Sequence, residues 1–244
     1  MKETMKNKIT VFLMGGVLLG LSLVCWFKPS KEYSDSERRK LAEFPQLNQE
    51  TILSGRFMKD FETYTLDQFP LRDALRGVKS FSTLYLFQEK EINDLYVEDG
   101  YVIKAEYPLS QPMTDNAAKK FQSIYEKYLK GKDTDLFLSI VPDKNYFAGE
   151  DTGRLTMDYS KMAASLTEQL PYFRYLDLFD CLKLEDYYYT DTHWKQENLL
   201  FAAQTLASGM GVPISTEYET KEIPEDFYGV YYGQLALPVK PDKI

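Results

Sequence analysis

The strongest hydrophobic pattern along the chain is an uncharged run over residues 9–27. As a helix, its 19 residues would be about 28 Å long, close to the hydrocarbon thickness of a bilayer. Lys2, Lys6 and Lys8 precede the run, and basic residues in that place favour a cytoplasmic amino terminus. The pattern therefore predicts a transmembrane signal-anchor at 9–27, with residues 1–8 as a cytoplasmic basic end.

Two alternatives to an uncleaved anchor stay open. A cleaved signal peptide needs small residues at its cleavage site, whereas the run ends in the bulky Trp26 and Phe27. Lipidation at Cys25 needs small residues where Leu23 and Val24 stand. In each case the bulk of the chain lies outside the membrane. The predicted localisation is the cell membrane, single-pass, with an extracytoplasmic globular domain.

Helical and strand-like periods alternate through the rest of the chain. Residues 28–50 are charged and predict a stalk, and residues 51–244 predict one extracytoplasmic domain. Apolar residues at helical spacing predict helices at 53–69, 71–85, 114–129, 159–170 and 199–207. Strands are predicted at 95–97 and 101–103 around the turn Asp99-Gly100, at 136–141 before Pro142, and at 172–178.

This order of elements is typical of an α/β domain. It predicts a three-layer architecture with a largely parallel sheet, preceded by a helical lead-in formed by the two helices between residues 53 and 85. Residues 212–244 are rich in Tyr, Pro and Gly and show no strong period.

Charge and residue counts exclude several classes of function. The net charge is −8 and no basic surface is concentrated, which argues against a nucleic-acid partner. The acidic surface is also a poor match to anionic lipid, so attachment to the membrane is expected through the N-terminal helix alone. A single histidine excludes a multi-histidine metal centre, and the chain has no Cys-x-x-Cys pair. A hard cation held by Glu185, Asp186, Asp191 and His193 is the weaker alternative to a site without metal. Cys25 and Cys181 are expected to be small buried apolar residues, and no cofactor is predicted.

The most informative polar motif is the tetrad Asp191-Thr192-His193-Trp194. In an extended segment Asp191 and His193 project from the same side, so the carboxylate can orient the imidazole and stabilise its cation. These two residues are the predicted catalytic pair. The alternative is a capping aspartate beside a lone histidine.

Aromatic residues around the pair are candidates for substrate binding. Trp194 could form a wall of the site, and Tyr187 and Tyr189 could offer faces on which a sugar stacks. The alternative for the tyrosines is packing in the core and at its rim.

Two other polar features have both a functional and a structural interpretation. Asp67, Arg72 and Asp73 flank Phe69-Pro70, either as a polar clamp near a substrate or as caps and ion pairs at a helix break. Lys144 follows the predicted strand at 136–141, and either faces the site or lies in a turn.

The tetrad and five further stretches resemble the DHHW protein family, which is named for the tetrad written here Asp-Thr-His-Trp. In chain order the other stretches are Ser36–Leu41 before Phe44-Pro45, Asp67–Asp73, Asn93–Ile103, Val141–Lys144 and Phe227–Tyr232. The chain is more distantly similar to SGNH-hydrolase-like proteins of alginate O-acetylation. That resemblance implies a three-layer SGNH-like fold. It also implies that Asp191 orients His193, and that His193 acts as general base for a serine arriving later in the chain.

No serine of this chain fits that role by its sequence context. None lies in a Gly-x-Ser-x-Gly or Gly-Asp-Ser motif, and Ser139, Ser160, Ser165 and Ser208 are expected to be ordinary strand or helix residues. We therefore expect a domain that is incomplete at its C-terminus and inactive alone.

The resemblance implies a membrane-anchored, extracytoplasmic O-acyltransferase or esterase that modifies cell-surface polysaccharide. Its expected partners are that polysaccharide and an acyl-donating membrane protein. The alternative is a non-catalytic cell-envelope protein that binds glycan or a partner.

Overall fold

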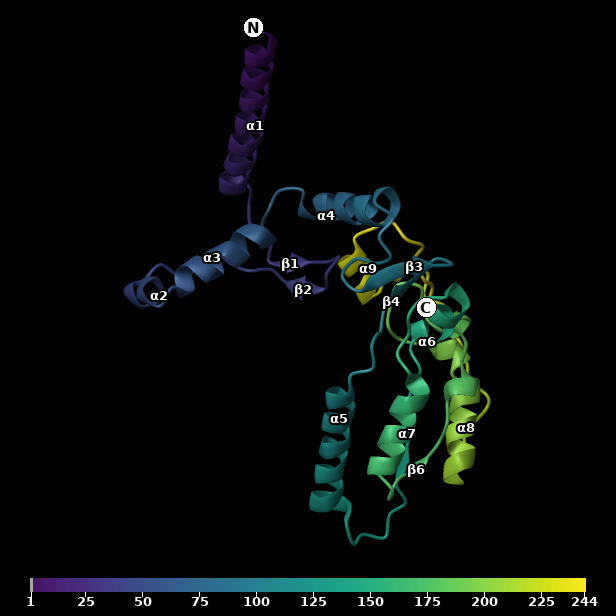
Figure 1. Cartoon of the computed structure of the whole chain (residues 1–244). Helices are drawn as coiled ribbons and strands as arrows, with labels where there is room; N and C mark the ends of the chain where they lie inside the picture. The colour runs from purple at the N-terminus through teal and green to yellow at the C-terminus, as the bar shows by residue number, and fades with distance from the viewer. Residues whose placement is uncertain (1) are drawn as a thin grey trace. The chain divides into compact units, whose positions relative to one another are not determined.

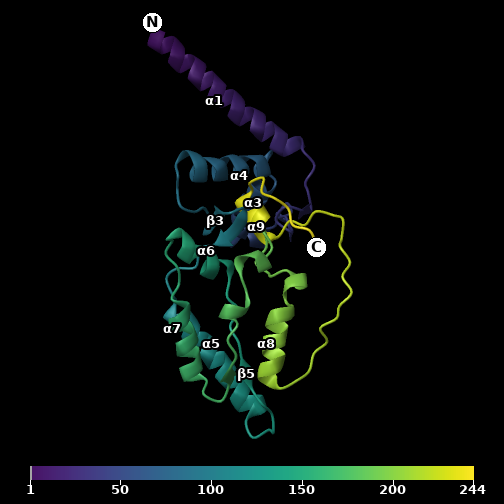
Figure 2. The ribbon, with the colours of Figure 1, turned by 90° about the vertical axis from the view of Figure 1, so that its right-hand side faces the viewer.

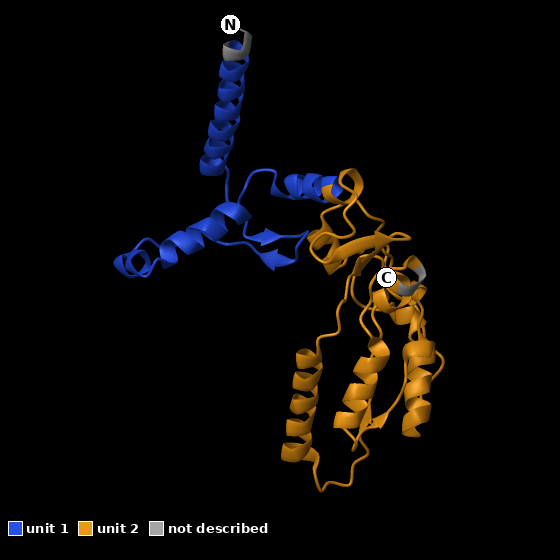
Figure 3. Ribbon diagram, in the orientation of Figure 1, with its two compact units in different colours: residues 1–82 blue, residues 83–244 orange. Residues whose placement is uncertain are grey.

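The computed structural model describes residues 2–244, with the side chains of residues 5–149 and 152–244. The chain divides into two compact units, Met1–Ser82 and Thr83–Ile244, shown in separate colours in Figure 3. The division falls within the second helix of the predicted lead-in, 71–85, so most of the lead-in belongs with the N-terminal segment.

The first unit begins with the apolar helix α1, Lys2–Phe27 (Figure 1). Its part Met5–Phe27 is long and apolar enough to cross a membrane, and no described residue covers the most apolar stretch. The predicted apolar N-terminal helix is confirmed. Its length and composition fit a membrane anchor and a secretory signal sequence equally well.

Beyond α1, the first unit holds a short hairpin and three helices. These are β1 (Tyr33–Ser34) antiparallel to β2 (Arg39–Lys40), α2 (Gln49–Leu53), α3 (Arg56–Asp67) and α4 (Arg72–Phe81). Asn48 caps α2 by accepting a hydrogen bond from the Thr51 N–H at 2.9 Å. α3 and α4 confirm the helical lead-in, and the break between them falls at Pro70, where a helix cannot continue.

Ion pairs tie the β1–β2 hairpin to the break between α3 and α4. Arg39 donates two hydrogen bonds to the buried Asp67, at 2.9 and 2.6 Å, and Ala42 N–H donates a third at 2.9 Å. Arg72 pairs with Glu37 at 2.8 Å. The Arg39 hydrogen bonds outweigh burial and hold the pKa of Asp67 below its usual range. Asp67 and Arg72 therefore form ion pairs at the helix break. This agrees with the structural alternative given above and not with a polar clamp near a substrate.

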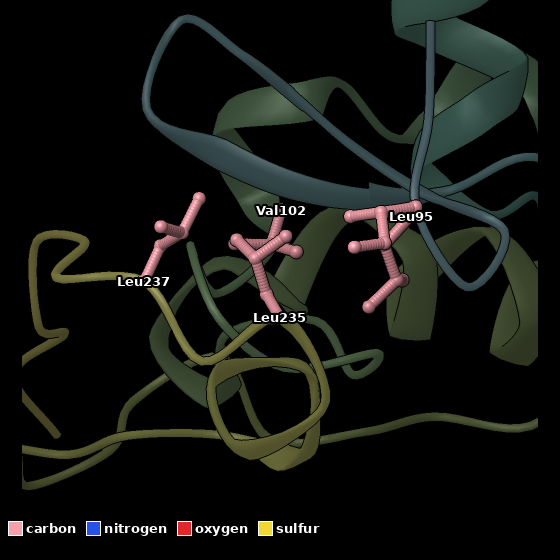
Figure 4. Close-up of a cluster of buried hydrophobic side chains, with 5 residues drawn as sticks. Leu95, Val102, Leu235 and Leu237 are labelled. Carbon is pink, nitrogen blue, oxygen red and sulfur yellow. The ribbon is translucent and has the colours of Figure 1, made fainter. Parts of the chain in front are cut away.

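The second unit begins with a hairpin, β3 (Leu95–Glu98) antiparallel to β4 (Tyr101–Lys104), as predicted. Asp99 and Gly100 both have positive φ, at 48° and 83°, which matches the right-handed twist of a two-residue hairpin. The hairpin packs on α9 (Val230–Leu235). Figure 4 shows Leu95 and Val102 facing Leu235 and Leu237 in one buried cluster.

A second part of this unit is mainly helical. α5 (Gln111–Ile124) continues into the π-helical turn η2 (Tyr125–Leu129) and packs against α7 (Tyr159–Gln169). Two short strands, β5 (Phe137–Leu138) and β6 (Arg174–Tyr175), pair in parallel beside these helices. Ala118, Leu138, Leu166 and Leu170 form the shared core.

The remaining elements are short turns of helix and one longer helix. They are η1 (Ser82–Leu86), α6 (Lys144–Thr152), η3 (Phe179–Cys181), η4 (Leu184–Asp186), η5 (Gln196–Asn198) and α8 (Leu200–Met210). Residues 212–229 then run from α8 to α9 without helix or regular strand, as Figure 2 shows.

The predicted three-layer fold with a largely parallel sheet is wrong. The described residues contain three two-stranded sheets, and only β5–β6 is parallel. The apolar run 136–141 gives a strand of only two residues, because Pro142 and Asp143 lead directly into α6. The predicted strand at 172–178 is paired only at Arg174–Tyr175, and its last residue, Leu178, packs in a cluster of loop and short helical residues. An apolar run shows burial but not strand pairing.

Candidate active site

The tetrad lies in a bent loop whose two ends are paired. Tyr187 and Trp194 form an antiparallel bridge, Tyr188 N–H donates to His193 O at 3.2 Å, and Lys195 N–H donates to Asp186 O at 2.6 Å. We call residues 187–194 the tetrad loop. Residues 189–193 bend between these ends, so Asp191 and His193 meet through a turn and not along an extended strand.

Asp191 and His193 are in direct contact. The Asp191 Oδ1 lies 2.5 Å from His193 Nδ1 and accepts the His193 N–H at 3.1 Å, while Oδ2 accepts the Val230 N–H at 3.0 Å. The carboxylate is 4% exposed and the imidazole 75%. A buried acceptor thus fixes Nδ1 and leaves Nε2 accessible.

Hydrogen bonding sets the charge of this carboxylate. Burial alone would raise the pKa of Asp191, but the His193 ring and the N–H groups of Val230 and His193 bind its ionised form and hold the pKa below the usual range. An ionised Asp191 can stabilise the imidazolium that forms when His193 takes a proton.

Gly229 allows the 229–231 segment to approach the tetrad closely. Its N–H donates to Thr190 Oγ1 at 2.7 Å, and Tyr231 N–H donates to Thr190 O at 3.0 Å. A Cβ at position 229 would lie 2.3 Å from the Asp191 Cβ and 2.4 Å from Thr190 O. Only glycine fits this contact, and its φ of −79° shows that the requirement is space and not backbone conformation.

A second buried aspartate binds the backbone of the tetrad loop. Asp242, 3% exposed, accepts the Tyr189 N–H at 2.8 Å, the Thr190 N–H at 3.2 Å and the Thr190 hydroxyl at 3.3 Å. Asp242 is itself held by two backbone hydrogen bonds with Phe227, both 2.9 Å. The polar groups of Tyr189 and Thr190 in the tetrad loop are therefore satisfied by Asp242, which lies about fifty positions later in the chain.

Lys144 lies buried beneath the same loop. Its Nζ donates to Tyr188 O at 3.0 Å and to Tyr189 O at 3.1 Å, and the side chain is within reach of the Tyr231 ring. Burial lowers the pKa of Lys144 to about 7, and the nearby Asp242 and Asp191 oppose that shift only in part. Lys144 supports the loop from inside and does not lie in an exposed turn.

The three aromatic candidates have different surroundings. Tyr187 is 1% exposed and its hydroxyl donates to Pro142 O, so its ring faces the core. Trp194 is half-buried and packs on the cluster that contains Tyr187. Tyr189 is half-buried, stacks on Tyr101 with ring centroids 4.4 Å apart, and has the Lys240 ammonium 4.9 Å from its ring centre. Of the three, Tyr189 has the most polar surroundings.

No serine hydroxyl in the described chain is hydrogen-bonded to His193. Ser139 donates to Leu176 O, Ser160 to Asp158, and Ser165 accepts from Gln111 and Gln169. Over the same residues, no group of three or more His, Cys, Asp or Glu side chains is arranged to hold a metal ion.

A cavity of the second unit lies away from the tetrad. Its volume is about 810 Å³, and its walls come from the β3–β4 hairpin, α5, α7 and the residues around Arg154. Neither Asp191 nor His193 is among the residues that line it. The histidine is instead on an open surface.

The pair is evident from the sequence, whereas the roles of three residues that hold the tetrad loop, Gly229, Lys144 and Asp242, are not. Gly229 falls within the Phe227–Tyr232 stretch that carries part of the family resemblance, so a signal for it existed. Lys144 was singled out without its burial. Asp242 lies in a region without a period or motif, and its role depends on a contact that local sequence does not encode.

Comparison with solved structures gives a relative of known architecture. The chain resembles a DHHW family protein from Eubacterium siraeum DSM 15702, with a TM-score of 0.50 and 20% sequence identity. The match covers 63% of this chain and 54% of that one, so this chain spans about half of that protein. The fold is shared with a DHHW family protein. At this identity the likeness concerns the fold alone. No protein-family model matches the chain, and no curated protein matches it.

Proposed function

We propose that this chain is a membrane-anchored, extracytoplasmic member of the DHHW family whose Asp191–His193 pair provides the general base for acyl transfer to cell-surface polysaccharide. The observation that carries the proposal is the 2.5 Å contact between a buried carboxylate and an imidazole that is 75% exposed. α1 supports the anchoring, and the shared fold together with the ordered sequence motifs supports the family.

In this mechanism His193 Nε2 takes the proton of a serine hydroxyl as the serine oxygen attacks the acyl carbonyl of a donor. The proton then passes from His193 to the leaving group, and the serine carries the acyl group as an ester. Next, His193 takes the proton of a polysaccharide hydroxyl as the hydroxyl oxygen attacks that ester, and it gives the proton to the departing serine oxygen, which regenerates the serine hydroxyl. Asp191 holds Nδ1 and stabilises the imidazolium in both halves.

The proposal places the serine outside these 244 residues. Among the described residues no serine hydroxyl contacts His193, and Ser139, Ser160 and Ser165 have other partners. The distant similarity to alginate O-acetylation proteins supports a serine in this role. An acyl-donating membrane protein is the proposed partner.

A polymer substrate agrees with the surroundings of the pair. His193 is exposed on an open surface, and the cavity of about 810 Å³ is not lined by it. An open surface admits a chain of sugar units, whereas a small substrate is normally enclosed in a pocket. The alternative of a non-catalytic glycan-binding surface receives less support, because Tyr187 and much of Trp194 pack in the core.

The test is complementation in a strain that lacks the protein, with the O-acetyl content of its cell-surface polysaccharide as readout. The wild-type protein should restore O-acetylation, and His193→Ala should lower the transfer rate by about 10²–10⁴-fold, the usual contribution of a general base. Glu197→Gln, at an exposed position close by, is the matched control and should restore it. Full O-acetylation with His193→Ala would contradict the proposal.

A further inference from the structure

α4 presents an apolar stripe to solvent. Leu71, at the N-terminal cap, and Leu75 and Val78, within the helix, recur at helical spacing and are 72%, 48% and 65% exposed. Ser80, on the opposite side, is 3% exposed, and Arg76 is half-buried on that same side. A surface helix normally turns its apolar stripe toward a core. Here the polar side is the one that packs, and the apolar side is left outward.

The start of α4 is held close to the end of α1. Gln68 binds the Lys31 backbone through two hydrogen bonds, accepting the Lys31 N–H at 2.9 Å and donating to Lys31 O at 2.8 Å. Ser30 and Tyr64 hydroxyls meet at 3.0 Å beside this contact. We call these interactions the Gln68 clamp.

The clamp limits the distance from α4 to the membrane surface. Lys31 is four residues after Phe27, where α1 ends, and four residues span at most about 14 Å. Arg72, the first residue of α4, is likewise four residues after Gln68, which adds at most about 14 Å. If α1 spans a bilayer, the first turn of α4 is confined to a shell near its outer surface.

We propose that α4 is an interfacial helix that lies on the outer leaflet, with Leu71, Leu75 and Val78 in the lipid and the Arg76 side toward the protein. The inference rests on the proposed membrane anchoring by α1. The stripe is expected to bind lipid because the Gln68 clamp holds α4 close to the end of α1, and therefore close to the bilayer surface. Lys79 is exposed beside the stripe, and a lysine there can extend its ammonium to the lipid phosphates.

The experiment uses the full chain in vesicles of phosphatidylcholine and phosphatidylglycerol. Cys25→Ser and Cys181→Ser remove the native thiols, and Val78→Cys then carries a polarity-sensitive fluorophore. Glu168→Cys, at an exposed position of α7, carries the same probe as the matched control. Vesicles in which the lipid tails are brominated report contact with lipid by quenching the probe. Circular dichroism verifies that each variant retains its helix content, and sedimentation on a density gradient shows whether the chain floats with the vesicles.

Three outcomes are distinguishable. The proposal expects the chain to float, the probe at 78 to be quenched severalfold by brominated lipid, and the probe at 168 to be unaffected. If the chain floats and the probe at 78 is not quenched, whether it is wet or covered by protein, the interfacial helix is overturned and the anchor stands. If the chain does not float, the anchor is overturned and the interfacial helix with it.

Discussion

Each unit of the molecule contains a buried aspartate with several hydrogen bonds, and the two aspartates differ in the side chain that they bind. Asp67 in the first unit receives both arms of the Arg39 guanidinium and a backbone N–H. Asp191 in the second unit receives an imidazole and two backbone N–H groups. Both carboxylates are held ionised, with pKa values below the usual range, but by partners of different chemistry.

That difference separates a structural pair from a reactive one. Arginine stays protonated throughout the physiological range, so the Arg39–Asp67 pair can only hold two segments together. An imidazole can take up and release a proton within a reaction, and the His193 ring is exposed whereas the Asp191 carboxylate is not. A buried carboxylate therefore holds two segments together in the first unit, whereas in the second unit it orients a candidate proton acceptor. The following substitutions test this comparison.

Gly229→Ala should have the largest effect on stability, because its Cβ would overlap Asp191 Cβ, which lies at 2.3 Å. Overpacking of this kind costs about 3 kcal/mol, measured as the free energy of unfolding of the full chain in detergent micelles. Gly131→Ala is the control. It has open space and a φ of +78°, so backbone strain alone should cost about 1 kcal/mol. Equal losses at the two positions would contradict the close approach at Gly229.

Asp67→Asn should follow, because Arg39 and Ala42 N–H then lose a charged acceptor, with an expected loss of about 2 kcal/mol. Asp73→Asn is the matched control, since its carboxylate is 61% exposed and 3.5 Å from Arg72, and it should cost less than about 0.5 kcal/mol.

The wild type and Asp67→Asn should also differ in how their stability changes at acidic pH. Its folded pKa is depressed, so the stability it contributes is present above the unfolded pKa of about 4 and is lost as the pH falls through the folded value. The wild type should therefore lose more stability than Asp67→Asn between about pH 5 and 3. Parallel acid profiles would show that the carboxylate is not held by Arg39.

Lys144→Met should change how the free energy of unfolding depends on pH above about 7. With a folded pKa of about 7 and an unfolded value of about 10.4, the unfolded chain binds more protons between these limits. The free energy of unfolding should therefore rise with pH from about 7 upward, by at most about 1.4 kcal/mol per pH unit.

That slope should be absent in Lys144→Met and kept in Lys119→Met, a control at an exposed position. Asp191 and Asp242, the carboxylates that face Lys144, are present in both variants. A slope that survives in Lys144→Met would show that another group causes it.

His193→Gln should have the smallest effect on stability. Asp191 keeps its hydrogen bonds from the backbone N–H groups of Val230 and residue 193, and the lost ring is 75% exposed, so the expected change is within about 0.5 kcal/mol. Together with the expected loss of O-acetylation, this separates a reactive histidine from a structural one. A large drop in the thermal midpoint would assign His193 to the scaffold.

Local periodicity was enough to predict most helices and one hairpin. The spacing of apolar residues placed α3, α4, α7 and α8, and Asp99-Gly100 marked the β3–β4 turn. These features depend on neighbours within a few residues, which is why sequence alone encodes them.

The sheet and the surroundings of the tetrad depend on distant contacts and were not predictable in this way. Within the run 136–141 only Phe137 and Leu138 pair with another strand, β6. Nothing in the sequence of that run indicates that the pairing stops after two residues. The Asp191–His193 contact was predicted, but its geometry comes from a bend. Gly229 and Asp242 act on residues 38 to 53 positions earlier.

The bonds from Asp242 to the tetrad loop also impose an order in time. Synthesis proceeds at about 5–20 residues per second, so residue 242 emerges several seconds after residues 189 and 190. During that interval Asp242 is not yet available to accept the N–H groups of Tyr189 and Thr190. The contacts that hold the tetrad loop are thus completed late in synthesis, after α5 and α7 have been made.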